Sequence, residues 1–334
     1  AYFEDMGFRL ASNSTRPDKA FTFVVINQDI VNAFAAPGGV IALYSGLILA
    51  ADDENEVAGV LAHEIAHVTQ QHLYRAIESQ QAMTIPLALA MLGLVLVGGG
   101  SGEAIQGALL GGQAAAAQAQ INFTRQNESE ADRIGIQTLS HAGYDPVGMA
   151  EFFGKMGRIT RSMGEGPPEY LRTHPVSVSR VTEAKDRAEN MPKPPPANNR
   201  DFYLVQMRLR AQIEEYPDTA LEWFAHRLER ADISQEETDA LFYGQAIALQ
   251  RKGKYREARQ LLKSLIARDQ HVAYELQLAD LDLDAGEDGA ALDRLGGLYH
   301  NFAGNHAISM QYSRALLKNR QAGQAETAGV ILRQ

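Results

Sequence analysis

A stiff, proline-rich stretch divides the chain into two regions of different character. Residues 191–200 read MPKPPPANNR. Proline removes a backbone donor and fixes φ, so such a run forms an extended spacer and is unsuited to a helix or sheet interior. The 334 residues are enough for two domains. We predict a first domain at 1–192, a linker at 193–200 and a second domain at 201–334.

The composition excludes several classes of function. The net charge is −10, and we find no cluster of Lys and Arg of the kind that binds phosphate, so we expect no nucleic-acid partner. The absence of cysteine excludes a disulfide framework, a zinc–thiolate site and a thiol nucleophile. No signal peptide is visible, and we interpret both ends as processed or trimmed, which would leave the second domain truncated at its C-terminus.

Three short apolar segments near the N-terminus predict β-strands. They are Ala20–Ile26, Ile30–Ala35 and Val40–Tyr44. The sequences NQD at 27–29 and PGG at 37–39 are typical of turns between strands. The pattern predicts a small antiparallel meander.

The next segment predicts an amphipathic helix with two histidines on one face. Asp53 is a suitable N-cap, and Glu56 can complete a capping box. His63 and His67 are four residues apart, which suits two imidazoles that reach one tetrahedral zinc ion. Glu64 lies beside that face, where it can take a proton from activated water and pass it to the leaving amine. Two solvated histidines on a surface helix are the alternative interpretation.

A third metal ligand is expected on a later helix, where Glu128 and Glu130 compete. The face through Glu128 continues as a buried stripe, whereas the face through Glu130 continues as a wetter one. A carboxylate at the head of a buried face is the better ligand, so we predict Glu128. Asp132, one turn beyond, could orient a zinc-bound histidine from behind.

Other polar residues near the motif carry weaker expectations. We expect the helix to continue past His72, which places His72 off the metal face and in solvent. An edge strand beside a metal commonly aligns an extended peptide by strand addition, so Asn32, Ala33 and Phe34 are candidates for substrate binding. A plain core role for these three residues is the alternative.

Residues 83–121 are unusual in composition. The run Ile85–Val97 is apolar throughout, and a segment rich in small residues follows. A membrane-spanning helix needs about 20 apolar residues, and this run is shorter. We therefore predict an active-site flap or a membrane-facing helical hairpin at Ile85–Gln120, and no span.

The second region predicts stacked pairs of helices. Gly253–Ala258, Gly286–Ala291 and Gly323–Ala328 each place Gly five residues before Ala. The first two begin 33 residues apart and the next 37, close to the tetratricopeptide period of about 34. We expect the Gly to end the first helix of each pair and the small Ala to admit the second. Such repeats are generally binding scaffolds.

Four strings in this order resemble the HtpX-like membrane-associated metallopeptidases. They are NAFAAPGG at 32–39, AHEIAHVTQQH at 62–72, NESEADRIGIQ at 127–137 and THPVSVSR at 173–180. The resemblance covers essentially the whole chain and extends to the periplasmic members with tetratricopeptide repeats. It implies an α+β zincin-like metalloprotease domain, mostly helical with a small antiparallel sheet, followed by an all-α tetratricopeptide-repeat domain.

The resemblance also implies a site and an activity. It implies a metalloendopeptidase with one Zn²⁺ per chain, held by His63, His67 and Glu128, in which activated water attacks the peptide carbonyl. It places His174 and Arg180 at the cleft and allows His174 to take the fourth metal position as a latch. A released His174, or Arg180, could instead stabilise the oxyanion, and a plain loop role for His174 is the other alternative.

The same resemblance implies a location and partners. The expected compartment is the periplasm, and the expected partners are misfolded or stalled outer-membrane proteins and the outer-membrane assembly machinery. Peripheral membrane contact is a further expectation. The alternative function is a repeat-based chaperone or adaptor with a latent protease core.

Overall fold

The structure is a computed structural model that describes residues 2–79, 102–163, 167–195, 198–319 and 323–333. The chain forms two compact units, Phe3–Ala197 and Asn198–Gln334, and each is described by itself. Their division falls inside the proline-rich stretch at 191–200.

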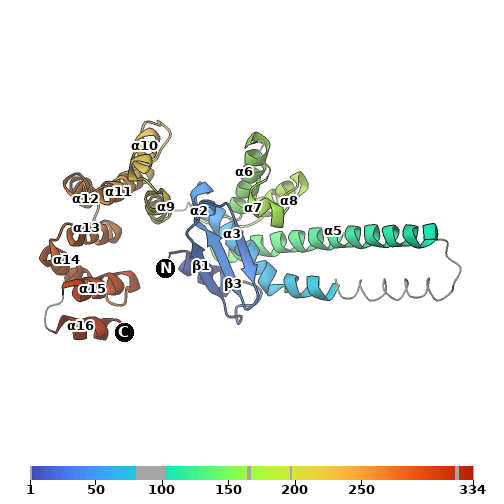
Figure 1. Cartoon of the computed structure of the whole chain (residues 1–334), viewed down its shortest axis with the longest axis horizontal. Helices are drawn as coiled ribbons and strands as arrows, with labels where there is room; N and C mark the ends of the chain where they lie inside the picture. The colour runs from blue at the N-terminus through green and yellow to red at the C-terminus, as the bar shows by residue number, and fades with distance from the viewer. Residues whose placement is uncertain (1, 80–101, 164–166, 196–197, 320–322, 334) are drawn as a thin grey trace. The chain divides into compact units, whose positions relative to one another are not determined.

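A three-stranded sheet lies near the N-terminus of the first unit (Figure 1). Its strands are β1 (Thr22–Ile26), β2 (Ala33–Ala36) and β3 (Val40–Tyr44), in the order β1-β3-β2. β2 pairs with β3 in antiparallel fashion, but β1 pairs with β3 in parallel fashion. The predicted antiparallel meander was therefore wrong, because β3 inserts between the other two strands.

Contacts outside the sheet explain this order. The carbonyl of Gln28, just after β1, accepts hydrogen bonds from the Ser45 hydroxyl and the Gly46 amide, both at 3.0 Å. The segment after β1 is therefore held next to the C-terminal end of β3. From there it leads to β2, which lies on the other side of β3 from β1. Gly38 and Gly39 have φ of 87° and 83°, which closes the tight turn between β2 and β3.

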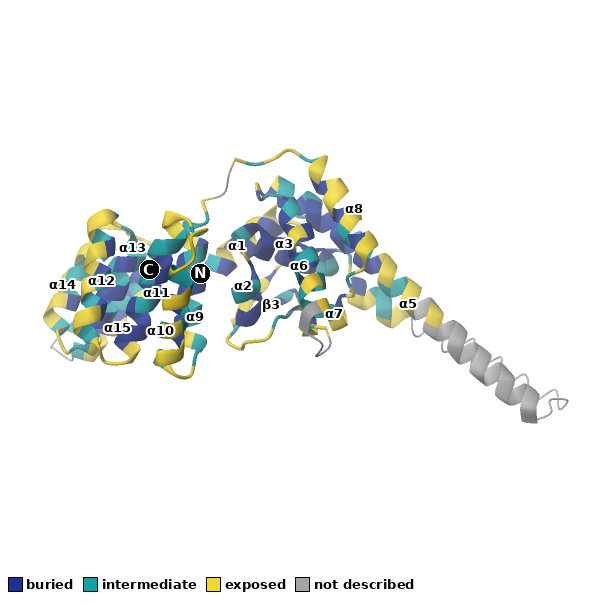
Figure 2. Ribbon diagram, turned by 90° about the horizontal axis from the view of Figure 1, so that it is seen from above, coloured by how far each residue is buried: buried dark blue, intermediate teal, exposed yellow. Residues whose placement is uncertain are grey.

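Helices make up the rest of the first unit. They are α1 (Tyr2–Ser12), α2 (Ser45–Ala50), α3 (Glu54–Thr69), α5 (Gly102–His141), α6 (Val147–Met163), α7 (Glu169–Thr173) and α8 (Val178–Glu189), and residues 72–79 are also helical. α3 is the central element and packs against β2, β3, α5 and α6. Of its 16 residues, 13 are buried, so it forms the core of the unit (Figure 2).

Both ends of α3 are defined by specific contacts. The Asp53 side chain accepts from the Glu56 amide at 3.0 Å, as predicted for the N-cap. The Glu56 carboxylate accepts from the Asp52 amide at 2.8 Å and from Lys155 Nζ at 2.6 Å. The helix ends at Thr69, and Gln71 has a left-handed φ of 57° before the chain becomes helical again at 72. The expected continuous helix past His72 was therefore wrong.

Two glycines let the neighbouring helices approach α3 closely. A Cβ at Gly59 would lie 2.8 Å from Met149 Cα on α6. A Cβ at Gly135 on α5 would lie 3.2 Å from the backbone nitrogen of His63. The second approach brings the carboxylates of α5 within reach of the histidines of α3.

Every described element of the second unit is a helix. These are α9 (Arg200–Ile213), α10 (Pro217–Leu228), α11 (Gln235–Arg251), α12 (Tyr255–Arg268), α13 (Val272–Asp284), α14 (Asp288–Asn301), α15 (His306–Asn319) and α16 (Gln324–Ile331). Successive helices pack on one another, with α11 on α12, α13 on α14 and α15 on α16. Gly253, Gly286 and Gly323 all have left-handed φ, between 77° and 86°. Ala258, Ala291 and Ala328 are fully buried, as expected where a second helix approaches.

The unusual segment at 83–121 is only partly described. The apolar run Ile85–Val97 lies outside the described residues, and residues 102–121 form the first half of α5. Among the residues that the structure describes, no helix has the length and apolar character needed to cross a membrane.

The Gly59 contact gives a prediction about stability. Although alanine favours a helix by up to about 1 kcal/mol over glycine, Gly59→Ala should destabilise the first unit by about 1–3 kcal/mol, since its Cβ meets backbone. Gly154→Ala on α6 is the matched control, because its Cβ would meet only ordinary contacts at 3.5 Å and beyond. Urea unfolding followed by circular dichroism measures both. Equal stability of the two variants would contradict the close approach.

Candidate active site

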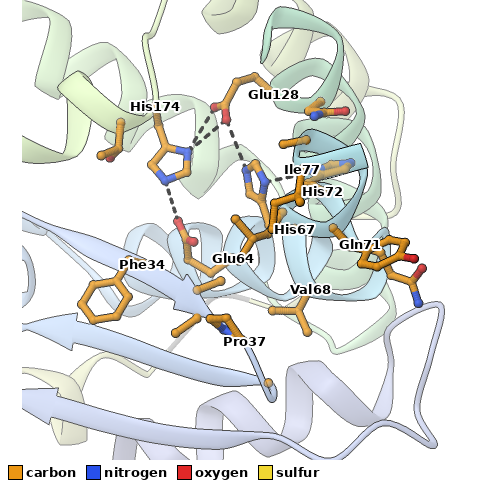
Figure 3. A pocket seen from close by; sticks show the side chains of 18 of the residues that line it. Phe34, Pro37, Glu64, His67, Val68, Gln71, His72, Ile77, Glu128 and His174 are labelled. Carbon is orange, nitrogen blue, oxygen red and sulfur yellow. Dashed lines mark hydrogen bonds and ion pairs between the residues drawn. The ribbon is translucent and has the colours of Figure 1, made fainter. Parts of the chain in front are cut away.

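Four side chains from three helices converge in the first unit. His63 and His67 lie on the C-terminal half of α3, Glu128 lies on α5, and His174 follows the last residue of α7. One ligand atom from each lies within 4.8 Å of the other three. His63, Glu128 and His174 are buried, and His67 is partly buried at the wall of a cavity (Figure 3).

These atoms lie close enough together to share one metal ion. His63 Nε2 lies 3.0 Å from His67 Nε2, 3.3 Å from His174 Nδ1 and 3.5 Å from Glu128 Oε2. Glu128 Oε1 lies 3.3 Å from His67 Nε2 and 3.1 Å from His174 Nδ1. Zinc–ligand bonds of about 2.0–2.1 Å make the edges of a tetrahedron about 3.3–3.4 Å long. The four residues could therefore hold one zinc ion.

The outer contacts of His63 orient its ring. His63 Nδ1 lies 2.9 Å from Asp132 Oδ1, so the ring faces this carboxylate with Nδ1 and the other ligands with Nε2. Burial opposes the charged imidazole, but Asp132 and Glu128 raise the pKa of His63 to about 10. The site therefore favours a positive charge at this position, which a metal ion could supply in place of the Nε2 proton.

Glu128 supplies the negative charge of the cluster. Burial opposes its ionisation, yet hydrogen bonds from His174, His63 and His67 hold its pKa well below the usual range. A buried carboxylate surrounded by imidazole nitrogens is a ligand set that a divalent cation satisfies.

Arg180 and Asp132 stand behind the ligands. Arg180 donates to both oxygens of Asp132, from Nε at 2.7 Å and from Nη2 at 2.8 Å. Its Nη1 lies 2.9 Å from Glu128 Oε2 and donates to the Pro175 carbonyl at 2.6 Å. Neither Arg180 nor Asp132 lines the cavity. Arg180 therefore contacts two carboxylates, those of Asp132 and Glu128, away from the cavity lining.

Glu130, the rival ligand, lies outside the cluster. Its Oε2 accepts from Arg75 Nη1 at 2.8 Å and lies 3.2 Å from His72 Nε2. His72 is only 3% exposed and contacts His67, with the two Nδ1 atoms 2.9 Å apart. The expectation of a solvated His72 was therefore wrong, because the break at Gln71 turns its ring toward His67. Burial lowers the pKa of His72 to about 4, which keeps it neutral near pH 7.

Glu64 lies at the mouth of the site, where it and His174 face one another (Figure 3). Glu64 Oε1 is 3.4 Å from His174 Nε2. The His174 amide donates to the Tyr170 carbonyl at 2.8 Å, and its ring packs on the buried Tyr170 ring at 5.0 Å. The Tyr170 amide in turn donates to the Val31 carbonyl at 3.1 Å, which ties α7 to the chain that enters β2.

A cavity of about 660 Å³ opens beside Glu64 and His67. One wall is the edge strand β2 and its turn, from Phe34 to Gly39, and Phe34 and Pro37 flank the opening (Figure 3). Of the three predicted substrate-binding residues, only Phe34 lines it. Ala33 is fully buried, and the Asn32 side chain accepts from the Ala33 amide at 2.9 Å.

The opposite wall contains residues that the sequence pattern did not single out. They come from the helix at 72–79 and from α5, and include Leu73, Tyr74, Ile77, Phe123 and Asn127. Their only sequence signal was their nearness to the two histidine and glutamate motifs. Three of them, Leu73, Tyr74 and Ile77, are about half exposed, at 51%, 59% and 49%, so this wall is apolar and accessible.

Known proteins similar to this chain are peptidases. Peptidase family M48 matches residues 1–188. A beta-barrel assembly-enhancing protease of Yersinia pestis is 36% identical over 325 residues, which is 97% of this chain and 66% of the relative. The protein of the same name in Escherichia coli (strain K12) is 36% identical over 332 residues, 99% of this chain and 67% of the relative.

A more distant relative matches about half of the chain. The mitochondrial metalloendopeptidase OMA1 of Arabidopsis thaliana is 34% identical over 157 residues, which is 47% of this chain and 29% of that protein. The chain spans about two thirds of the length of the two bacterial relatives. The resemblance that the four sequence strings indicated is confirmed, and the chain belongs to peptidase family M48.

Proposed function

We propose that this chain is a zinc-dependent endopeptidase that acts on outer-membrane β-barrel proteins in the periplasm. The observation that carries the proposal is the tetrahedral spacing of His63, His67, Glu128 and His174 beside a cavity with Glu64 at its mouth. Membership of family M48 and the names of the two bacterial relatives support the reaction and the class of substrate.

Glu64 would act as the general base. Bound zinc would polarise the peptide carbonyl and lower the pKa of water, which is the chemistry that such a site supplies. The Glu64 carboxylate would take the proton from the attacking water and deliver it to the leaving amine. Asp132 and Arg180 would keep the His63 ring in the tautomer that presents Nε2 to the metal.

The edge strand β2 would align the substrate. It is the outer strand of the described sheet, and its far edge faces the cavity. An extended peptide could add there as a further strand, held by main-chain hydrogen bonds. Phe34 and the apolar wall opposite would then contact its side chains.

His174 would act as a latch in the resting state. Its Nδ1 lies 3.3 Å from His63 Nε2 and 3.1 Å from Glu128 Oε1, at the fourth corner of the tetrahedron. A catalytic zinc site keeps that position for water, so His174 would exclude the attacking water until it moves away. The packing of its ring on Tyr170 supports a held position rather than a passing one.

The second unit would select the substrate. We infer that α9–α16 are tetratricopeptide repeats, because left-handed glycines and buried alanines recur at the junctions of its helix pairs. Such repeats form scaffolds that bind partners. The expected partners are stalled outer-membrane proteins and the assembly machinery. A chaperone with a latent protease is the second candidate, and the position of His174 favours it for the resting state.

The reaction predicts a specific effect of Glu64→Gln. Purified protein should carry about one zinc per chain, and the variant should keep that zinc while losing cleavage of an unfolded β-barrel substrate, because an amide cannot accept the proton. Elemental analysis and a gel-based cleavage assay measure both quantities. Proteolysis that survives in the variant would remove Glu64 as the base.

The ligand set predicts a contrast between two neighbouring glutamates. Glu128→Gln should weaken zinc binding strongly, since it removes the negative ligand. Glu130→Gln should weaken it far less, because the amide oxygen can still accept from His72. Competition with a chromogenic zinc chelator gives both affinities. The reverse order would assign the metal to Glu130.

The latch predicts a gain of activity. His174→Ala should raise proteolysis and could cause self-cleavage, because the fourth position becomes available to water. If His174 instead stabilises the oxyanion, the same change should lower the rate by about 10²–10³-fold. Initial rates on an unfolded β-barrel substrate decide between them, with the double variant that also carries Glu64→Gln as the inactive control.

A further inference from the structure

We propose that His72 is a positioning residue for the metal ligand His67. It accepts a hydrogen bond from His67 Nδ1, which leaves the lone pair of His67 Nε2 directed at the metal. The inference rests on the zinc site proposed above, and it concerns His72, to which the sequence patterns gave no role. Arg75 and Glu130 complete the arrangement.

The protons along this chain of side chains can be assigned one by one. Glu130 Oε2 lies 3.2 Å from His72 Nε2, and a carboxylate only accepts, so His72 Nε2 carries a proton. In the tautomer that carries this proton, His72 Nδ1 is an acceptor. His67 Nδ1 lies 2.9 Å away and can donate to it. His67 Nε2, which lies 3.3 Å from Glu128 Oε1 and 3.0 Å from His63 Nε2, is then the nitrogen that faces the metal position.

The backbone bends in a way that makes this contact possible. On an uninterrupted helix, a residue five positions after His67 would project about 140° away from it. The helix instead ends at Thr69, and Gln71 takes φ of 57°, a conformation that residues other than glycine rarely adopt. The chain resumes as a helix at 72 with the His72 ring against the His67 ring, at a centroid distance of 4.8 Å (Figure 3).

The contacts behind His67 resemble those behind His63, the other proposed ligand on α3. His63 Nδ1 lies 2.9 Å from Asp132 Oδ1, and Asp132 is held by Arg180. For His67 the carboxylate is Glu130, held by Arg75 at 2.8 Å, and His72 is inserted between ring and carboxylate. Both carboxylates come from α5. Each metal-binding imidazole of α3 thus has its outer nitrogen engaged by an acceptor, which fixes the tautomer and the ring orientation.

Zinc affinity is the first test, measured on the full chain with Glu64→Gln as the parent, so that self-cleavage does not interfere. His72→Leu removes the acceptor and should weaken zinc binding by about 10–100-fold, the usual effect of losing such a partner. His72→Asn places an amide oxygen near the position of Nδ1 and should recover most of that loss. His141→Leu, at an exposed histidine on α5, should bind zinc as the parent does.

The tautomer of His67 is the second test and needs neither zinc nor activity. In a zinc-free parent that also carries Glu128→Leu, so that no carboxylate faces His67 Nε2, ¹⁵N-histidine NMR should find the His67 proton on Nδ1. When His72→Leu is added to this protein, the proton should move to Nε2. If His72→Leu does not fold, Glu130→Leu serves in its place, since it frees the His72 ring to reverse its own tautomer and lose its acceptor role.

The outcomes separate the possibilities. Parent-like zinc affinity in His72→Leu, or a His67 proton on Nε2 in the parent that carries Glu128→Leu, would overturn the proposal. Equal loss of affinity in His72→Leu and His72→Asn would also overturn it, because it would mean that His72 acts only by filling space. If the parent itself binds no zinc, the proposed function fails, and the His67 tautomer still decides the role of His72.

Discussion

The first unit is built around three imidazoles and one carboxylate whose polar atoms meet at one point. Three imidazole nitrogens and a carboxylate lie close together, with five of the distances between them at 3.0–3.5 Å. Such a cluster is costly unless a proton or a metal ion neutralises it. The raised pKa of His63 and the lowered pKa of Glu128 reflect this need for a neutralising charge. The helices around this cluster hold its side chains together.

The scaffold does this by bringing α5 and α7 against the centre of α3. Gly135 removes the Cβ that would keep α5 away from the backbone at His63. Glu128 and Asp132 then lie one turn apart on the same face of α5, one inside the cluster and the other beside His63. Arg180 joins these two carboxylates, and Tyr170 positions His174 from the far side. The edge strand β2 is left beside the metal position with its free edge toward the cavity.

Local patterns in the sequence predicted the parts of this site that depend on helix periodicity. The i, i+4 histidines, the Asp53 cap and the choice of Glu128 over Glu130 all follow from which residues share a helical face. The strand order could not be predicted in this way, because it depends on hydrogen bonds between Gln28 and the start of α2. The burial of His72 was also missed. The break that causes it falls at Gln71, where neither glycine nor proline gives a signal.

The central claim is that one zinc ion occupies the centre of this cluster, and X-ray absorption at the zinc edge tests it most directly. In the resting full-length chain we expect four ligands, three imidazoles and one carboxylate oxygen, at about 2.0–2.1 Å. A first shell with only two imidazoles, or with six oxygens, would contradict the account, since the first would exclude His174 as the resting ligand and the second would place the metal elsewhere.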